Sequence, residues 1–300
     1  MEEGRPSLTA VGVAMMRAVH LLLDDGPKIL EDNLALAFSG AENEAALRAN
    51  VDAFLAGFTA RVGSDRAQAL FRYLRAIMVV RNRYAEDELA KAMARGVAQY
   101  VILGAGLDSF VYRRPDLAGV VQVFEVDYPA TQQWKRMRLC ELQVKLPPNL
   151  IFIPLDFETQ PLTEGLQAGG YRPEAPAFFS WLGVTMYLTE EAIFNTLQIV
   201  ASLALGSEIV FHYVVPEALL DEEHQRLLAA IKAGTAARGE PWLSCFETAD
   251  LKARIKELGF TQVWDLGPEE ANARYFAGRT DGLRVPPWVH LMSARVGSVR

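Results

Sequence analysis

The chain has 300 residues, of which 51% are hydrophobic, enough to build one large core. Its net charge is −7 and it has no dense Lys/Arg tract, so it lacks the basic surface that binds nucleic acid or anionic membranes. The two cysteines, Cys140 and Cys245, have neither metal-ligand nor disulfide spacing, which is typical of a reducing compartment. We therefore expect no nucleic-acid partner, no membrane partner and no metal site.

The apolar N-terminal stretch is too interrupted to be a membrane helix. Residues 8–23 contain Arg17 and His20, whereas a membrane helix needs ~18 uninterrupted apolar residues. The acidic pair Glu2-Glu3 precedes this stretch, where a secretory signal peptide carries basic residues. These features predict a cytoplasmic protein.

Helical periodicity dominates residues 1–95. Apolar side chains recur at intervals of three and four residues over 9–23, 43–62 and 67–94, which predicts three helices. No strand-like alternation precedes Gln99. We expect these residues to form a helical cap that belongs to the same domain as the rest of the chain.

Strands and helices alternate over residues 96–300, which predicts an α/β fold with a mostly parallel, doubly wound sheet. A helical insertion is expected at 216–245, after the fifth strand. The last two strands are expected to pair as an antiparallel hairpin. The strands are expected near 99–104, 120–126, 150–155, 177–182, 207–215, 260–265 and 288–296, and the helices near 109–114, 129–144, 189–204 and 248–258.

The most informative motif is a strand, a glycine turn, a helix and a second strand that ends in an acid. The first apolar strand breaks at Gly104, and the turn continues through Ala105 and Gly106. Asp108 is placed to cap the helix that follows, and the next strand ends at Asp127. This is the layout of a nucleotide-binding βαβ unit, in which glycines let the ligand approach the backbone and the acid binds ribose hydroxyls.

The loop differs from a dinucleotide fingerprint at the third glycine. Three residues after Gly106 stands Ser109, and Asp108 places a negative charge at the start of the helix. An acid there suits the helix dipole but repels a diphosphate. The loop therefore favours a cationic or neutral nucleoside ligand, and S-adenosyl-L-methionine fits better than NAD.

Several motifs, in the same order, resemble the leucine carboxyl methyltransferase family, and more closely its bacterial branch of S-adenosylmethionine-dependent methyltransferases. The resemblance spans nearly the whole chain. It implies a Rossmann-like class I fold with a seven-stranded sheet, whose substrate side is covered by the N-terminal helices and the insertion. The motifs are Thr9-Ala10, Arg17-Ala18, Arg81-Asn-Arg-Tyr84, Gly104-Ala-Gly-Leu-Asp-Ser109, Tyr112-Arg113, Glu125-Val-Asp-Tyr-Pro129, Lys135, Leu155-Asp-Phe157, Ser180-Trp-Leu-Gly-Val-Thr-Met-Tyr-Leu188 and Gly239-Glu-Pro-Trp242.

Two acids at strand ends are candidates for cofactor binding, because ligands of open α/β folds bind at the carboxyl edge of the sheet. We expect Asp127 to accept hydrogen bonds from both ribose hydroxyls, with Tyr128 beside it; the alternative is a solvated loop acid. Asp156 would accept the adenine amine, and the backbone N–H of Phe157 would reach the ring. The alternative for Asp156 is a helix N-cap.

The resemblance implies that Arg81 binds the carboxylate of the cofactor's methionyl group. A guanidinium meets a carboxylate with a fork of N–H donors that lysine cannot reproduce. Arg83 is the second candidate for this role. The alternative is that both are surface arginines paired with acids of their own helix.

The fourth-strand motif departs from the family's protein-methylating enzyme. That enzyme carries Glu where this chain has Leu182, so one cofactor contact is lost and protein methylation is put in doubt. We expect Trp181 to contact the cofactor and Tyr187 to line the methyl-transfer pocket, although an aromatic residue after a buried strand is often simply core. His212 on the fifth strand is the candidate base, but a lone strand histidine is usually a hydrogen-bonded core residue.

These residues predict an enzyme that transfers a methyl group from S-adenosyl-L-methionine to the oxygen of a small-molecule acceptor, either a carboxylate or a hydroxyl. A carboxylate is ionised at neutral pH and needs no base, whereas a phenol with a pKa of about 10 gains from a positioned histidine. Two alternatives stay open. One is an NAD(P)-dependent oxidoreductase, and the other is a non-catalytic nucleoside-binding protein of the same fold.

Overall fold

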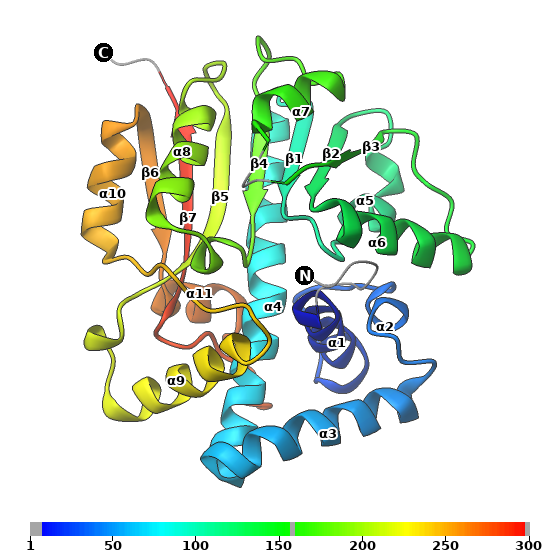
Figure 1. The fold of residues 1–300 in the computed structure, drawn as a ribbon, viewed down its shortest axis with the longest axis vertical. Coiled ribbons are helices and arrows are strands. Elements are labelled where there is room, and N and C mark those ends of the chain that lie inside the picture. Colours follow the sequence, from blue (N-terminus) through cyan, green and yellow to red (C-terminus); the bar gives the residue numbers. More distant parts are fainter. Residues whose placement is uncertain (1–7, 157–159, 298–300) are drawn as a thin grey trace.

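The computed structural model describes residues 8–156 and 160–297. A twisted sheet has helices on both faces, and a further group of helices lies below the carboxyl ends of its parallel strands (Figure 1). The strands are β1 (Gln99–Leu103), β2 (Gln122–Asp127), β3 (Leu150–Pro154), β4 (Phe178–Trp181), β5 (Glu208–Val214), β6 (Phe260–Leu266) and β7 (Val289–Val296). The α-helices are α1 (Leu8–Leu23), α2 (Ala35–Phe38), α3 (Glu44–Val62), α4 (Ser64–Ala94), α5 (Phe110–Arg113), α6 (Pro129–Glu141), α7 (Leu162–Ala168), α8 (Glu190–Ala201), α9 (Glu222–Ala236), α10 (Thr248–Glu257) and α11 (Pro268–Tyr275).

The sheet has seven strands in the order β3-β2-β1-β4-β5-β7-β6. The pairs from β3 to β5 are parallel, and β7 runs antiparallel to both of its neighbours. Strands β1, β4 and β5 are buried at every position, as expected for parallel strands covered on both faces. The predicted fold class and the seven strands are confirmed. Strands β6 and β7 pair as expected, but α11 lies between them, so they do not form a tight hairpin.

The long helices of the sequence analysis are confirmed, whereas three short ones were not predicted. Helices α2, α7 and α11 have 4, 7 and 8 residues. About two turns or fewer give too few residues for a 3.6-residue periodicity to be recognised. Local capping supports several of the others. For example, the Asn43 side chain accepts a hydrogen bond from Ala46 N at 3.0 Å at the start of α3.

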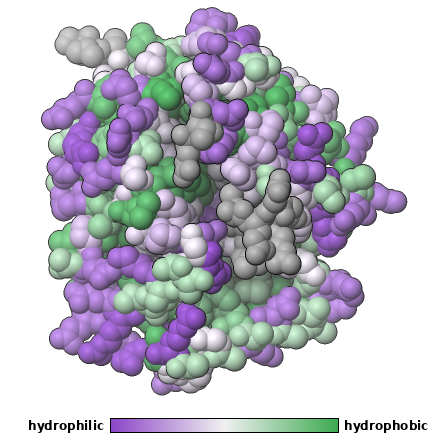
Figure 2. Space-filling view, viewed as in Figure 1, coloured by the Kyte–Doolittle hydropathy of each residue, from purple (hydrophilic) through white to green (hydrophobic). Residues whose placement is uncertain are grey.

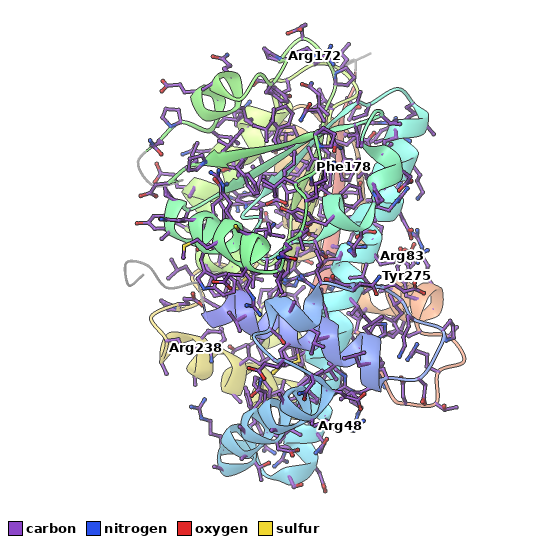
Figure 3. The ribbon with its side chains drawn as sticks, turned by 90° about the vertical axis from the view of Figure 1, so that its right-hand side faces the viewer. Arg48, Arg83, Arg172, Phe178, Arg238 and Tyr275 are labelled. Atoms are coloured by element: carbon purple, nitrogen blue, oxygen red, sulfur yellow. The ribbon has the colours of Figure 1, made fainter. Side chains whose placement is uncertain are left out.

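The main hydrophobic core occupies both faces of the sheet, and Phe178 of β4 lies near its centre (Figure 3). Helix α4 crosses behind the sheet and α8 lies in front of it (Figure 1). A second cluster joins α1, α3 and α4 around Met16, Leu47 and Phe71. A third includes Phe38 of α2 and Leu139 of α6. The N-terminal helices are therefore packed against the edge of the sheet where its parallel strands end.

The surface in the view of Figure 2 is largely hydrophilic, with hydrophobic side chains in small groups among the polar ones. No helix in the described ranges combines the length and the hydropathy that crossing a membrane requires. A short 3-10 helix, η2 (Thr185–Tyr187), follows β4 and contributes Tyr187 to the site described below.

Candidate active site

A cavity of about 550 Å³ lies at the carboxyl ends of β1, β2, β3 and β4. Its floor is the glycine loop after β1 and the ends of the neighbouring strands. Its walls and roof come from α1, from Arg81 and Asn82 of α4, from residues 182–188 and from residues 239–243. Pockets of 300–1,000 Å³ typically hold small ligands, so this cavity has room for a nucleoside cofactor.

The glycine loop and Asp127 form one hydrogen-bonded unit. Gly104 has φ +65°, and a Cβ there would lie 2.6 Å from Val184 Cγ2, so the turn needs glycine for both reasons. Asp127 Oδ2 accepts a hydrogen bond from Gly106 N, and Oδ1 accepts one from Tyr128 N at 2.7 Å. Burial raises the pKa of Asp127, while the two N–H donors oppose that rise. The carboxylate thus shapes the loop and lines the cavity at once.

Asp108 connects the glycine loop to α4. Its Oδ1 accepts from Phe110 N, the first residue of α5, at 2.8 Å, although Ser109 rather than Asp108 occupies the N-cap position. Its Oδ2 accepts from Asn82 Nδ2 at 3.1 Å. Both Asp108 and Asn82 line the cavity, and Asn82 was not predicted as a site residue.

Two buried arginines line the cavity, and their partners differ. Arg17 Nε is 2.8 Å from Asp32 Oδ2, and its Nη2 donates to Leu107 O at 2.6 Å. Arg81 makes no ion pair with any described residue, and its buried Nε has no hydrogen-bond partner. Burial and the nearby Arg17 lower the pKa of Arg81 to about 10, so it is still a cation at neutral pH. Among the described residues that line the cavity, Arg81 is therefore a buried cation without an ion pair.

Arg83 does not reach the cavity. Its Nε donates to Asp87 Oδ1 at 2.8 Å, and its side chain is 46% exposed. Figure 3 shows Arg83 and Tyr275 together at the edge of the molecule, where both contact Asp87. The alternative interpretation, a surface arginine paired within its own helix, therefore holds for Arg83. Arg81 does not fit it.

One end of the cavity lies beside the carboxyl end of β3. Leu155 and Asp156 line it there, and Leu155 N donates to Asp127 O at 2.8 Å. Asp156 N donates to Gln160 Oε1 at 3.1 Å. Phe157 lies outside the described residues. The structure thus places Asp156 and Asp127 on one cavity, at the ends of adjacent strands.

The residues predicted on β4 and β5 divide between cavity and core. Leu182 and Tyr187 line the cavity, and burial raises the pKa of the Tyr187 phenol. Trp181 is fully buried in the main core and does not line the cavity, so the geometry does not support its expected cofactor contact.

His212 is likewise 3% exposed and outside the lining. Burial, with a smaller effect from Arg81, lowers the pKa of His212 to about 3. The imidazole is neutral at physiological pH, and it is a poor base.

The roof joins two segments that are distant in sequence. Thr9 Oγ1 of α1 donates a hydrogen bond to Glu240 Oε2, and both residues line the cavity. Arg17 and Glu240 belong to motifs noted in the sequence but were not predicted as site residues. For Arg17, the signal was a charge on an otherwise apolar helix.

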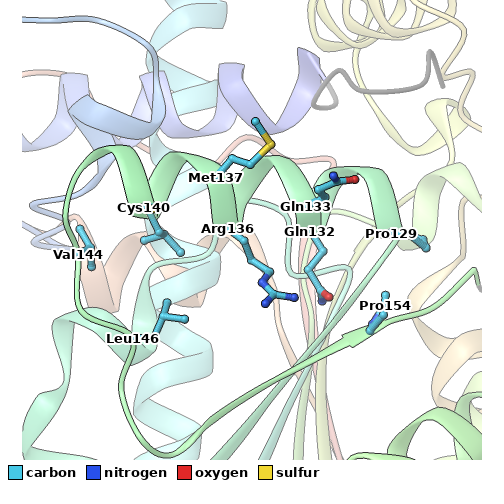
Figure 4. Close-up of a pocket in the computed structure, with 10 residues that line it drawn as sticks. Pro129, Gln132, Gln133, Arg136, Met137, Cys140, Val144, Leu146 and Pro154 are labelled. Atoms are coloured by element: carbon cyan, nitrogen blue, oxygen red, sulfur yellow. The ribbon is translucent and has the colours of Figure 1, made fainter.

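A second groove, of about 740 Å³, runs along the outer side of α6 beside β3 (Figure 4). Gln132 and Arg136 point from α6 toward the strand, and Arg136 lies 5.2 Å from the Phe152 ring centroid. The groove shares no lining residue with the cavity and has few charged groups. Although it is larger, the convergence of backbone N–H groups, acids and a buried cation identifies the smaller cavity as the candidate site.

The chain is similar in sequence to known proteins. Residues 10–201 match the model of the leucine carboxyl methyltransferase family. Over 303 residues, the chain is 29% identical to "Putative S-adenosyl-L-methionine-dependent methyltransferase YktD" of Bacillus subtilis, covering 98% of this chain and 99% of that one. A protein of Frankia alni with the same description, FRAAL3836, is 30% identical over 255 residues, 83% of this chain and 85% of its own.

The fold has a counterpart among solved structures. A crystal structure described as a putative methyltransferase from Thermobifida fusca covers 98% of this chain and 96% of its own, with a TM-score of 0.58 and 16% identity. That likeness supports the architecture, and the family match extends over well more than half of the sequence. The chain belongs to the leucine carboxyl methyltransferase family.

Proposed function

We propose that this methyltransferase transfers a methyl group from S-adenosyl-L-methionine to an oxygen atom of a small-molecule acceptor. The observation that carries the proposal is Arg81, a buried cation without a carboxylate partner among the described residues, on the same cavity as Asp127 and the glycine loop. A ligand with a carboxylate and a ribose, separated by a short chain, matches these groups. The names of the relatives add S-adenosyl-L-methionine as that ligand.

Each end of the cofactor has a candidate partner. Arg81 would hold the methionyl carboxylate with paired N–H donors, and Asp127 would accept the ribose hydroxyls. Asp156 would accept the adenine amine, with Ala105 and Tyr128 beside the ligand. The sulfonium of the bound cofactor supplies an electrophilic methyl group. The protein then needs chiefly to align the acceptor and to exclude water.

The acceptor is proposed to be a small molecule because the roof is formed by the chain itself. Helix α1 meets residues 239–243 over the cavity, and apolar side chains such as Val13, Leu182 and Leu243 line it. Leu182 also replaces the glutamate of the family's protein-methylating enzyme. A small acceptor with an apolar body fits this environment better than the end of a protein chain.

Calorimetric titration with S-adenosylhomocysteine and with NAD tests the proposal. We expect binding of S-adenosylhomocysteine and none of NAD, since Asp108 repels a diphosphate. Replacing Asp127 by alanine should weaken S-adenosylhomocysteine binding by ~1.5–3 kcal/mol, the range for hydrogen bonds to a charged group. Tight binding of NAD without binding of S-adenosylhomocysteine would favour the alternative function, an NAD(P)-dependent oxidoreductase. Binding of S-adenosylhomocysteine without transfer of a labelled methyl group to any fraction of host extract would favour a non-catalytic protein.

A further inference from the structure

Two buried side chains of opposite charge line the cavity without pairing with each other. Arg81 and Asp108 are each 8% exposed, and both belong to the lining of the cavity. Within the ranges that the structure describes, neither makes an ion pair with any residue. A buried charge without a counter-ion is costly, so a fold that keeps one of each sign beside a cavity has a reason outside its own packing.

Arg81 and Asp108 lie at the ends of neighbouring strands. The Arg81 guanidinium packs against Gly183, two residues after the end of β4, where an added Cβ would lie 2.2 Å from Arg81 Nη1. Asp108 belongs to the loop after β1, and β1 pairs directly with β4. Asn82, the residue after Arg81 on α4, connects the two, because its Nδ2 donates to Asp108 Oδ2 at 3.1 Å. The unpaired cation and the unpaired anion are therefore neighbours on the cavity wall.

The Asp108 carboxylate has room for a further hydrogen-bond donor. Its Oδ1 accepts from Phe110 N at 2.8 Å and its Oδ2 accepts from the Asn82 amide, and both of these donors are uncharged. An ionised carboxylate can accept about four hydrogen bonds, so about two acceptor sites stay open. A cationic donor from a ligand would form a charge-assisted hydrogen bond there, roughly twice as strong as a neutral one.

The other acids of the lining lie elsewhere. Asp127 ends β2 and Asp156 follows β3, and both strands are on the far side of β1 from β4. Glu240 belongs to the roof, where it meets α1. Among the acids at the strand ends, Asp108 is thus the one beside β4 and Arg81.

We propose that Arg81 and Asp108 together bind a zwitterion, the α-amino-carboxylate end of the cofactor, with Asp108 accepting hydrogen bonds from the α-ammonium group. The inference rests on the proposed function, which assigns the carboxylate to Arg81, and adds a partner for the positive group on the same carbon atom. A ligand that carries only one of the two charges leaves the other side chain buried without a counter-ion. The pair therefore selects nucleosides that carry an amino acid. Asn82 is a positioning residue, because it holds one oxygen of the Asp108 carboxylate.

The test compares S-adenosylhomocysteine with its deamino analogue, the adenosyl thioether of 4-mercaptobutanoate, which keeps the carboxylate but has no ammonium group. Calorimetry on the full-length wild type should show that the deamino analogue binds about tenfold more weakly, the order for loss of one hydrogen bond to a charged group. Asp108→Asn should weaken S-adenosylhomocysteine by a similar factor. It should not weaken the deamino analogue, whose carboxylate Asp108 repels. Asp116→Asn, an exposed aspartate that follows α5, is the matched control and should change neither.

The difference between the two ligands cancels general damage to the pocket. Equal losses for both ligands in Asp108→Asn would make Asp108 a structural residue and overturn the inference, as would no loss for either. If Glu240→Gln removed the difference and Asp108→Asn did not, the roof acid would bind the ammonium group and the inference would be wrong.

The wild-type comparison needs no variant. A deamino analogue that binds the wild type as tightly as S-adenosylhomocysteine would overturn the inference and leave the proposed function standing. If the wild type bound neither ligand, the proposed function would fail, and the inference with it. Should Asp108→Asn be poorly folded, Asp108→Ser is the second variant, because its hydroxyl can still accept from Phe110 N.

Discussion

Two of the buried cations of this molecule, Lys135 and Arg81, differ in their partners. Between β2 and α6, Lys135 Nζ lies 2.6 Å from Glu125 Oε2, with both side chains 1% exposed. At the cavity, Arg81 has no carboxylate at ion-pair distance among the described residues. Burying a charge costs several kcal/mol unless a partner offsets it. A paired buried cation is thus part of the scaffold, whereas an unpaired one indicates a place for an anionic ligand.

The largest effect is expected where the buried pair is broken. Lys135→Met should lower the free energy of unfolding by ~3–5 kcal/mol at pH 8, because it leaves the Glu125 carboxylate buried without its counter-ion. Urea denaturation measures this change. Adding Glu125→Gln to the same variant should restore part of the loss, since the orphaned charge is then gone. If Lys135→Met alone were as stable as the wild type, the Lys135–Glu125 pair would not contribute to stability.

Substitution of Arg81, the unpaired cation, should leave stability intact and weaken ligand binding. Arg81→Met should leave the free energy of unfolding of the free protein equal to or above that of the wild type, because it removes an uncompensated buried charge. Binding of S-adenosylhomocysteine should fall by ~2 kcal/mol, the range for hydrogen bonds to a charged group. Calorimetry and urea denaturation measure the two quantities on the same samples.

Two further variants separate geometry from charge at Arg81. Arg81→Lys keeps the charge but loses the fork, so it should weaken S-adenosylhomocysteine and leave adenosine, which has no carboxylate, nearly unchanged. Arg83→Lys is the matched control and should affect neither ligand. Equal losses for S-adenosylhomocysteine and adenosine would make Arg81 a structural residue and remove the contrast with Lys135.

A smaller effect is expected from substitution of Gly183, which packs against the Arg81 guanidinium. Gly183 has φ +74°, and a Cβ there would lie 2.2 Å from Arg81 Nη1, so Gly183→Ala must displace the guanidinium. Gly96→Ala meets the same kind of backbone cost, at φ +94°, with no atom within 4 Å of the new Cβ. Both variants should lose ~1–2 kcal/mol of stability. Only Gly183→Ala should also weaken S-adenosylhomocysteine, and parallel titrations of the two variants decide the point.

A further prediction concerns the pH dependence of stability in the paired region. Burial raises the pKa of Glu125 to about 7, above its ordinary value of 4.5, although Lys135 opposes the rise. Between these values the folded protein holds a proton that the unfolded chain has lost, so this group's contribution to stability falls as the pH rises from 4.5 to 7. In Glu125→Gln this component should be absent. Urea midpoints of both proteins across that range check the sign, and parallel pH profiles would contradict it.

Sequence reasoning located the sheet and the floor of the cavity, because both depend on local patterns. Apolar runs identify buried strands, and glycines followed by a strand-end acid identify the βαβ turn. The roof was harder to predict. Glu240 reaches the cavity through the contacts of Leu243 and Ser244 with residues after β4, and no local pattern encodes such a contact.

The sequence also could not predict which aromatic and imidazole side chains line the cavity and which lie in the core. Tyr187 and Trp181 both follow or end β4, yet Tyr187 lines the cavity and Trp181 is fully buried. Which of the two reaches the cavity depends on the turn at residues 182–184 and on the packing of helices over each face. Arg81 and Arg83 could be ranked by family resemblance, but the ion pair of Arg83 with Asp87 is visible only in the structure.

The hydrogen bond between Thr9 and Glu240 joins residues 231 positions apart. During synthesis on a ribosome, α1 is made roughly 10 to 50 seconds before the segment that contains Glu240, and the glycine loop roughly 7 to 27 seconds before it. The nascent chain can therefore form the floor of the cavity before residues 239–243 of its roof have been translated. The cavity can therefore enclose a ligand only late in the synthesis of the chain. A chain truncated before residue 240 would keep the floor of the cavity but lack its roof.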